Sequence, residues 1–262
     1  MRKTDKQAAA RPVIEFSRVD LSFGDRKIID KLDLTVREGE FVCIIGPSGC
    51  GKTTALRMAG GLVNPTGGSV GVLGEAMLKP RRDVAIVFQD YGKALLPWRT
   101  AHGNISLALE AAGVAKAERG DRIEHLLEKV GLPGQGDKYP AEMSGGMQQR
   151  LQIARCLAQD PKVLLMDEPF GALDAMTRQT LQDELLSIAA DTRATVFFVT
   201  HDLEEAIYLG DRVVGLLPDP GRIGTMTEIG LPRPRDQLST REMPEFLALR
   251  RSLFDFIEKA EA

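Results

Sequence analysis

Hydrophobic and polar positions along the chain follow two patterns, one typical of strands and one of helices. Residues 13–40 alternate polar and apolar side chains around a turn at Gly24-Asp25, which predicts a pair of antiparallel strands. Residues 41–45, FVCII, are apolar on both faces, as in a buried strand. A glycine-rich loop and the helical pattern TTALRMAGGL follow them. The order strand, loop, helix indicates an α/β arrangement.

A second β-rich stretch precedes a long helical region. The segments GSVGVLGE and DVAIVFQ have the composition of strands. From about residue 101 to residue 158 the sequence is helical, with amphipathic spacing in RIEHLLEKVGL and QQRLQIARCLA. We interpret residues 101–158 as a helical subdomain inserted into an α/β core.

The pattern of the core resumes after residue 158. Two short buried strands, KVLLMDEP and TVFFVTHD, are separated by the helix RQTLQDELLSIAAD, an alternation typical of a parallel sheet. The acidic pair Glu204-Glu205 is expected to lie on a solvated helix face. A short β-rich piece beyond residue 213 is expected to end at PGRI.

The last part of the chain predicts a Pro-rich linker and one helix. The linker LPRPRD begins at residue 231, so residues 231–262 are set apart from a main domain of residues 13–230. Residues 1–12 are predicted to be a disordered tail. The apolar residues of the final helix fall on one face and are Phe246, Leu249, Leu253 and Ile257.

Composition and charge exclude several classes of protein. With 262 residues and 43% hydrophobic residues the chain can bury a substantial core, and its formal net charge of −3 gives no bulk reason to bind nucleic acid. Its longest apolar runs are far shorter than the about 20 residues of a membrane-spanning helix. Cys43, Cys50 and Cys156 have no zinc-site spacing. We expect free thiols in a reducing cytoplasm.

A phosphate-binding loop is the clearest chemical motif. Residues 46–53 fit G-x-x-x-x-G-K-[ST] between a predicted strand and a predicted helix, the context that this motif requires. Backbone N–H groups of such a loop bind the β- and γ-phosphates of ATP, Lys52 adds a positive charge, and Thr53 offers a hydroxyl to Mg²⁺. The predicted nucleotide-binding residues are Gly46, Pro47, Ser48, Gly49, Cys50, Gly51, Lys52, Thr53 and Thr54.

A pair of carboxylates at the end of a buried strand completes this chemistry. Residues 163–166 are aliphatic and lead into Asp167 and Glu168. Asp167 is expected to hold the Mg²⁺ shell. Glu168 is placed to orient and polarise an attacking water, so it is the predicted general base.

A third motif determines the class of nucleotide-binding protein. Ser144, Gly145 and Gly146 stand between Met143 and Met147, and a basic helix follows them. By itself this is a helix start with Ser144 as N-cap, and such a start is also an anion site. The segment resembles the signature of ABC ATPases, usually Leu-Ser-Gly-Gly-Gln, although Met occupies its first and last positions here. The resemblance implies contact with the γ-phosphate bound by the opposite subunit.

Further elements of the ABC ATPase family appear in the family's order along nearly the whole chain. The resemblance implies that Phe23 stacks on adenine, and that Gln89 senses Mg²⁺ and the γ-phosphate and touches the membrane subunit. It also implies that Asp174, in the D-loop Gly171-Ala172-Leu173-Asp174, crosses the dimer interface, and that His201 contacts the γ-phosphate.

The family resemblance implies a fold and a set of partners. The expected fold is an α/β P-loop RecA-like core with an antiparallel β subdomain and an inserted helical subdomain, formed by residues 13–230. The expected activity is ATP hydrolysis coupled to transmembrane transport. The expected partners are a second ATPase subunit in an ATP-bound homodimer, integral membrane permease subunits, and a solute-binding protein reached through the permease. No nucleic-acid partner is expected, and the expected location is peripheral, at the cytoplasmic face of the plasma membrane.

Other P-loop proteins fit the motifs less well. A P-loop kinase or GTPase does not require the Ser-Gly-Gly segment, Asp174 or His201. ABC ATPases of chromosome biology need long heptad arms, and those of translation carry two cassettes, whereas this chain has one cassette and no sustained heptads. A transporter subunit is therefore the leading interpretation, with an exporter subunit or a non-transport P-loop ATPase as alternatives.

Less specific features resemble importers of nitrate, sulfonates, taurine and related compounds. They are Phe88-Gln89-Asp90-Tyr91, Leu95-Leu96-Pro97-Trp98-Arg99, the Ser-Gly-Gly-Met-Gln-Gln-Arg run, Pro220-Gly221-Arg222-Ile223 and the LPRPRD tail. This resemblance implies import of a small anion, with Trp98 as an exposed anchor on the membrane partner.

Overall fold

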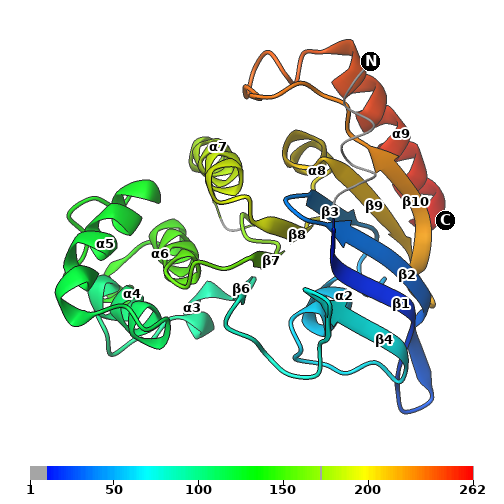
Figure 1. The fold of residues 1–262 in the computed structure, drawn as a ribbon. Coiled ribbons are helices and arrows are strands. Elements are labelled where there is room, and N and C mark those ends of the chain that lie inside the picture. The colour runs from blue at the N-terminus through cyan, green and yellow to red at the C-terminus, as the bar shows by residue number, and fades with distance from the viewer. Residues whose placement is uncertain (1–10, 172, 262) are drawn as a thin grey trace.

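The computed structural model describes residues 11–171 and 173–261, which form two sheets and a separate group of helices (Figure 1). The first sheet is antiparallel, in the order β2-β1-β4-β5. Its strands are β1 (Pro12–Phe23), β2 (Arg26–Arg37), β4 (Gly67–Val72) and β5 (Glu75–Ala76). Phe23 pairs with Arg26 across the turn at Gly24, as the sequence predicts. Pro12 already belongs to β1, so the predicted disordered tail of residues 1–12 extends too far toward the first strand. Residues 1–10 of this predicted tail lie outside the described residues.

The second sheet has six strands in the order β10-β9-β3-β8-β7-β6. Its strands are β3 (Phe41–Ile45), β6 (Val84–Val87), β7 (Val163–Asp167), β8 (Thr195–Val199), β9 (Arg212–Leu217) and β10 (Arg222–Glu228). All neighbours pair in parallel except β10, which runs antiparallel to β9. The expectation that β structure ends at PGRI is wrong. Pro220 and Gly221 precede β10, and Arg222 and Ile223 are its first residues. The alternating half-buried and exposed positions of β10 suit an edge strand.

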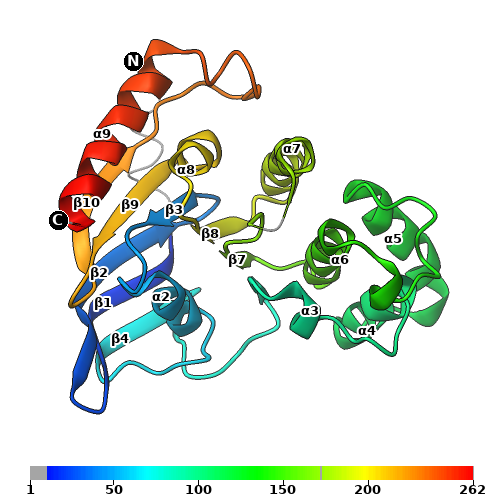
Figure 2. The ribbon, with the colours of Figure 1, turned by 180° about the vertical axis from the view of Figure 1, so that it is seen from behind.

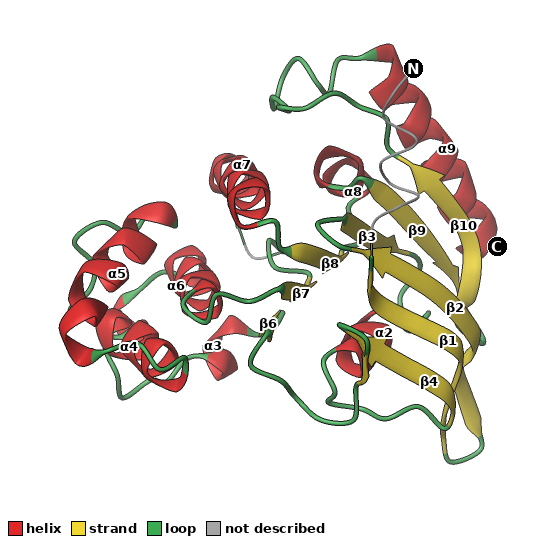
Figure 3. Cartoon of the chain, viewed as in Figure 1, coloured by secondary structure: helices red, strands yellow, loops and turns green. Residues whose placement is uncertain are grey.

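The helices divide between the six-stranded sheet and a second lobe. The helices α2 (Lys52–Ala59), α7 (Ala175–Thr192) and α8 (Leu203–Leu209) belong to the core. The second lobe, which is all helical in Figures 1 and 3, leaves the core after β6 and returns to it at β7. It contains α3 (Tyr91–Ala94), α4 (Ala101–Ala111), α5 (Lys116–Lys129), a 3-10 helix (Pro140–Glu142) and α6 (Gly145–Leu157).

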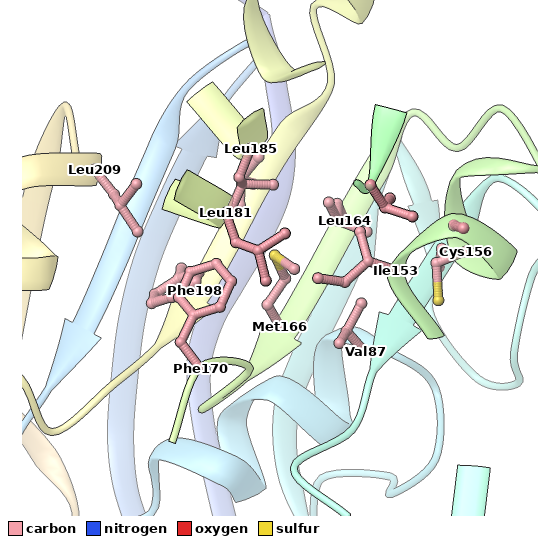
Figure 4. Close-up of a cluster of buried hydrophobic side chains, with 14 of the residues drawn as sticks. Val87, Ile153, Cys156, Leu164, Met166, Phe170, Leu181, Leu185, Phe198 and Leu209 are labelled. Carbon is pink, nitrogen blue, oxygen red and sulfur yellow. The ribbon is translucent and has the colours of Figure 1, made fainter. Parts of the chain in front are cut away.

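Hydrophobic packing on both faces of the six-stranded sheet holds the core together. Successive residues of β3 belong to different clusters: Cys43 lies in one, and Val42 and Ile44 lie in the other. In the first cluster, Phe170 packs on Phe198 with ring centroids 5.7 Å apart, beside residues of α7 (Figure 4). This two-sided burial is why the strands of the parallel sheet are apolar throughout.

The C-terminal helix α9 (Pro244–Glu261) packs along β9 and β10 (Figure 2). Phe246 and Leu253 are buried, while Leu249 and Ile257 are partly buried against the same cluster, as the apolar stripe predicts. The residues between β10 and α9 are not a free linker, because the side chains of Leu231 and Arg235 are buried. No helix of the described residues has the length and apolarity to cross a membrane.

Phe256 of α9 sits directly over two glycines of the sheet. A Cβ atom on Gly215 would lie 2.4 Å from Cε1 of Phe256, and one on Gly224 would lie 2.7 Å from Cε2 of the same ring. Both distances are shorter than any allowed contact. The two glycines therefore form the seat into which α9 docks.

The predicted solvated face of α8 is only half correct. Glu204 is partly exposed and pairs with Arg241 and Arg250, at 2.9 and 2.8 Å. Glu205, by contrast, is 4% exposed, and its Oε1 accepts a hydrogen bond from Nε2 of Gln182 at 3.0 Å. Burial raises the pKa of Glu205 to about 6. The expectation fails for Glu205 because this residue faces α7, where the buried Gln182 donates to it.

The glycine seat predicts a large difference between two Gly→Ala substitutions. Gly215→Ala should lower the free energy of unfolding by about 1 to 3 kcal/mol, because the new methyl group overlaps the Phe256 ring. Gly120→Ala, in α5 with nothing within 4 Å, should instead raise it by about 0.5 to 1 kcal/mol through helix propensity. Urea unfolding measures both. If Gly215→Ala were as stable as the original chain, α9 would not be seated as described.

The buried carboxyl of Glu205 predicts that Glu205→Gln stabilises the protein, and that the size of this effect depends on pH. Between the ordinary pKa of 4.5 and the folded value of about 6 the native state binds the extra proton, so the original chain loses stability as pH rises through this window. Glutamine does not titrate. The free energy of unfolding of Glu205→Gln should therefore exceed that of the original chain by about 1 to 2 kcal/mol at pH 7.5. At pH 4.5 the two should be almost equal.

The same unfolding series on Glu204→Gln is the control, because that carboxylate is half exposed and already paired. Its substitution should bring no gain at either pH. Equal behaviour of the two variants would contradict the account of Glu205 as a buried acid.

Candidate active site

The phosphate loop joins β3 to α2 and depends on glycine at its first position. Gly46 has φ 148°, and a Cβ atom there would lie 2.6 Å from the carbonyl oxygen of Leu216 and 2.7 Å from Sγ of Cys50. Gly51, at the N-cap of α2, has φ 95°, and no side chain caps the helix. The first N–H groups of α2 therefore lie at the open end of the loop, where an anion can bind.

Lys52 lies inside the curve of this loop. Its Nζ donates hydrogen bonds to the carbonyl oxygens of Gly46 and Pro47, at 2.7 and 2.9 Å, and the residue is 8% exposed. Ser48 and Gly49 are exposed at the tip. A buried ammonium surrounded by the loop places positive charge where the backbone N–H groups converge, which favours a polyphosphate.

Thr53 and Asp167 bring two hard oxygen atoms together from different elements. Oγ1 of Thr53, in the first turn of α2, donates to Oδ1 of Asp167, at the end of β7, over 2.9 Å. Asp167 is 5% exposed, and burial raises the pKa of its carboxyl group. A carboxylate and a hydroxyl beside a phosphate site are the donor set that Mg²⁺ takes when it also binds phosphate and water, so the residues fit this ion.

Glu168 stands at the meeting point of three segments. Its Oε2 accepts from Nε2 of Gln89 at 3.2 Å and lies 3.1 Å from Nδ1 of His201. The backbone of Glu168 is left-handed, with φ 47°, and its N–H donates to the carbonyl of Val199 at 2.9 Å. A cavity of about 40 Å³, wide enough for a water molecule, is bounded by Glu168, His201 and Glu205.

The structure brings the predicted metal ligands together only in part. Thr53 and Asp167 are hydrogen-bonded, whereas the Gln89 amide faces the carboxylate of Glu168 instead. Phe23, the predicted adenine contact, is 58% exposed beside the β1–β2 turn and is not a core residue. Thr54 is half-buried in α2.

Residues of the Ser-Gly-Gly segment lie on the other lobe. Ser144 caps α6 by accepting from the N–H of Met147 at 3.3 Å, and it is exposed. A Cβ atom on Gly146 would lie 2.9 Å from Leu173, so the segment packs against the residues that follow β7. Figures 1 and 2 show α6 well apart from α2. One chain therefore does not bring Ser144 to its own phosphate loop.

Asp174 is the N-cap of α7. Its carboxylate accepts from the backbone N–H of Thr177 at 3.0 Å, and this hydrogen bond lowers the pKa of Asp174. The side chain is exposed on the surface. Ala172 of the same predicted loop lies outside the described residues.

Sequence reasoning missed the residues that surround His201. Arg178 of α7 pairs with Asp202, the N-cap of α8, at 3.5 Å, and both border the small cavity beside Glu168. Arg178 and Asp202 are separated by 23 residues in the chain and belong to no motif. No signal in the sequence joins them before the fold is known.

Comparison with protein-family models and known proteins identifies relatives. The model described as ABC transporter matches residues 29–171. An uncharacterized ABC transporter ATP-binding protein of Methanocaldococcus jannaschii is 46% identical, and the match covers 98% of this chain and 95% of the relative. The bicarbonate transport ATP-binding protein CmpD of Synechocystis sp. is 47% identical, and the match covers 89% of this chain and 83% of the relative. The nitrate import ATP-binding protein NrtD of Synechococcus elongatus is 45% identical, with 87% and 84% covered.

Solved structures agree with the assigned fold. The dimeric structure of a post-hydrolysis state of an ATP-binding cassette bound to ADP and Pi matches with a TM-score of 0.73 and 31% identity. This match covers 82% of the present chain and 98% of that cassette. The expected RecA-like core with its β and helical subdomains and the resemblance to nitrate-type importers are confirmed. The chain belongs to the ABC transporter family, as an ATP-hydrolysing ATP-binding subunit.

Proposed function

We propose that this subunit hydrolyses ATP with Glu168 as general base and uses the energy to import a small anion through membrane partners. The observation that carries the catalytic part is the convergence of Gln89 and His201 on the Glu168 carboxylate, next to the Thr53–Asp167 pair. Gln89, Glu168 and His201 follow three neighbouring strands, β6, β7 and β8, and their side chains meet at one edge of the sheet.

ATP binding is assigned to the phosphate loop and to Phe23. The backbone N–H groups of residues 48–54 and the Lys52 ammonium bind the β- and γ-phosphates. The exposed ring of Phe23 offers an aromatic face for stacking on adenine. Thr53 and Asp167 hold Mg²⁺, which neutralises phosphate charge when bound.

The water that attacks the γ-phosphate is assigned to Glu168. Its Oε2 accepts hydrogen bonds, and the adjoining cavity admits a water molecule. His201 reaches the same carboxylate from the segment between β8 and α8, so it can hold Glu168 in place and contact the γ-phosphate. Gln89 contacts the same carboxylate from the segment after β6. Because the helical lobe follows this segment, Gln89 can couple the binding of phosphate and Mg²⁺ to a movement of that lobe.

A second copy of the chain completes the site. Ser144, Gly145 and Gly146 are displayed on the helical lobe away from their own phosphate loop, so they cap the γ-phosphate of a partner, and Asp174 lies in the same interface. The dimeric state of the related ATP-binding cassette supports this arrangement. Two sites then form in a two-fold homodimer.

The membrane partner is assigned to the surface near Gln89. Phe88 is 36% exposed and Trp98 is 70% exposed, which is unusual for large aromatic side chains. Both flank α3, at the start of the helical lobe. We assign this surface to integral membrane permease subunits, which places the chain at the cytoplasmic face of the membrane and connects it to a solute-binding protein through the permease.

The direction and the substrate rest on the relatives. Proteins named for bicarbonate transport and nitrate import match most of the chain at 45 to 47% identity. These names favour import over export and small oxyanions over larger solutes. Sulfonates and taurine remain within the same chemical class of small anions.

The role of Glu168 predicts a separation of binding from hydrolysis. Glu168→Gln should bind ATP normally and lose about 10²- to 10⁴-fold in hydrolysis, because the amide cannot take a proton from water. The ATP-bound dimer should then accumulate in size-exclusion chromatography. Adding Ser144→Arg should dissolve that dimer, whereas Lys52→Ala should weaken nucleotide binding itself. Hydrolysis by Glu168→Gln at the original rate would overturn the assignment.

The import proposal predicts a defect in anion uptake. A strain without this gene should take up labelled nitrate or bicarbonate more slowly, and the original gene should restore uptake while the Glu168→Gln gene should not. Normal uptake of these anions and normal growth on sulfonates as sulfur source would rule the proposed substrate class out. That result would leave the ATPase assignment standing.

A further inference from the structure

His201 occupies the point where β8 leads into a very short helix. It directly precedes Asp202, which caps the seven-residue helix α8 by accepting from the N–H groups of Glu204 and Glu205. The His201 side chain is 68% exposed, and Nδ1 contacts Glu168. A helix of this length is not stable alone, so its position comes from tertiary contacts. The imidazole is therefore placed by whatever holds α8.

Two arginines of the Pro-rich segment hold the C-terminal end of α8. Nη1 of Arg235 donates to the carbonyl oxygens of Ile207 and Tyr208, at 3.2 and 2.6 Å. Nη2 of Arg233 donates to the carbonyl of Leu209 at 3.0 Å and pairs with Asp211 at 2.9 Å. Cationic donors at the last carbonyls of a helix satisfy its free acceptors and match its dipole.

A third arginine, between the Pro-rich segment and α9, holds the N-terminal end. Nη1 of Arg241 pairs with Glu204, in the first turn of α8, at 2.9 Å, and Arg250 reaches the same carboxylate at 2.8 Å. The guanidinium of Arg241 also lies over the ring of Tyr208, 5.0 Å from its centroid. One side chain thus contacts both ends of the helix.

A buried amide adds a second connection. Gln182 of α7, 1% exposed, donates to Glu205 at 3.0 Å, and its Oε1 accepts from Nη2 of Arg241 at 3.2 Å. Gln237 donates to the same oxygen at 3.4 Å. The C-terminal segment is thereby bonded to α8 directly and through α7.

We propose that residues 231–250 act as a clamp on α8 that positions His201, with Arg241 as its principal positioning residue. In Figure 1 this segment leaves β10, crosses above α8 and returns as α9. Displacement of the clamp shifts the first turn of α8 and moves the imidazole away from Glu168. ATP hydrolysis then falls while the phosphate loop still binds nucleotide. The effect on hydrolysis rests on the proposed role of His201.

The three histidines of the chain allow a direct test, because His102 and His125 are exposed in the helical lobe and serve as internal references. Histidine-ring NMR spectra of the full chain are compared for Arg241→Ala, Glu204→Ala and Arg251→Ala. His201→Ala assigns the His201 signal. Arg251 is the control, since it is an arginine of α9 next to Arg250, and its ion pair is with Asp255 of the same helix, at 3.0 Å.

The clamp predicts that Arg241→Ala and Glu204→Ala shift the His201 signal and leave the other two unchanged, and that Arg251→Ala shifts none. The ATP hydrolysis rate should fall about 10- to 100-fold in the first two variants, because a displacement of about 1 Å in a catalytic group has effects of this size. Nucleotide affinity should stay within about two-fold of the original, since no phosphate-binding residue changes. Arg241→Lys, which keeps the charge opposite Glu204, should recover part of the rate.

Separate outcomes decide the clamp and the role of His201. If Arg241→Ala and Glu204→Ala leave the His201 signal unchanged, the clamp is wrong. If Arg241→Ala does not fold, the result for Glu204→Ala decides the question. If the signal shifts but His201→Ala hydrolyses ATP at the original rate, the clamp stands and the proposed role of His201 is wrong. In the His201→Ala background, Arg241→Ala should lower the rate no further, and an additional loss of equal size would contradict positioning through His201.

Discussion

The parallel pairing of β3, β8 and β7 is the interaction on which the site depends. Val199, the last residue of β8, pairs with Ile44 on one side and with Asp167 on the other, so the three strands end level. The phosphate loop, Glu168 and the segment of His201 all leave the sheet at this edge. Because both faces of the strands are buried, a slip of one residue would exchange the side chains that pack in the two hydrophobic clusters and would disrupt the packing of both. The packing of the core therefore fixes the relative positions of the polar groups.

The edge of the sheet also explains the unusual backbone of Glu168. A left-handed conformation costs a non-glycine residue about 1 kcal/mol or more. Here the N–H of Glu168 still bonds to Val199, which keeps the residue against β8 while the chain turns away. The turn directs the carboxylate toward Gln89 and His201. Local strain of this kind is found where a side chain must be aimed at a site.

Motif spacing was sufficient to predict the elements of the site but not the contacts behind them. Gly46, Lys52 and Asp167 belong to local patterns whose neighbours define strand, loop and helix, so their placement follows from the sequence. The burial of Glu205 does not, because it depends on α7, whose Gln182 lies 23 positions earlier in the chain and meets Glu205 only in the folded structure. The extent of β10 and the contact of Phe256 with the sheet could not be predicted either. The need for glycine at positions 215 and 224 follows from the position of α9, which is known only from the fold.

The starts of α6 and α7 form one surface, although the two helices belong to different lobes. Ser144 and Asp174 cap helices of different lobes, yet Gly146 packs against Leu173, so the starts of α6 and α7 are neighbours on one surface. Met176, one residue into α7, is 74% exposed there. Caps and an exposed apolar side chain on one surface suit contact with another copy better than contact with water. Under the proposed function, the base and the metal ligands belong to the core of one chain, and the capping group comes from the helical lobe of a second copy.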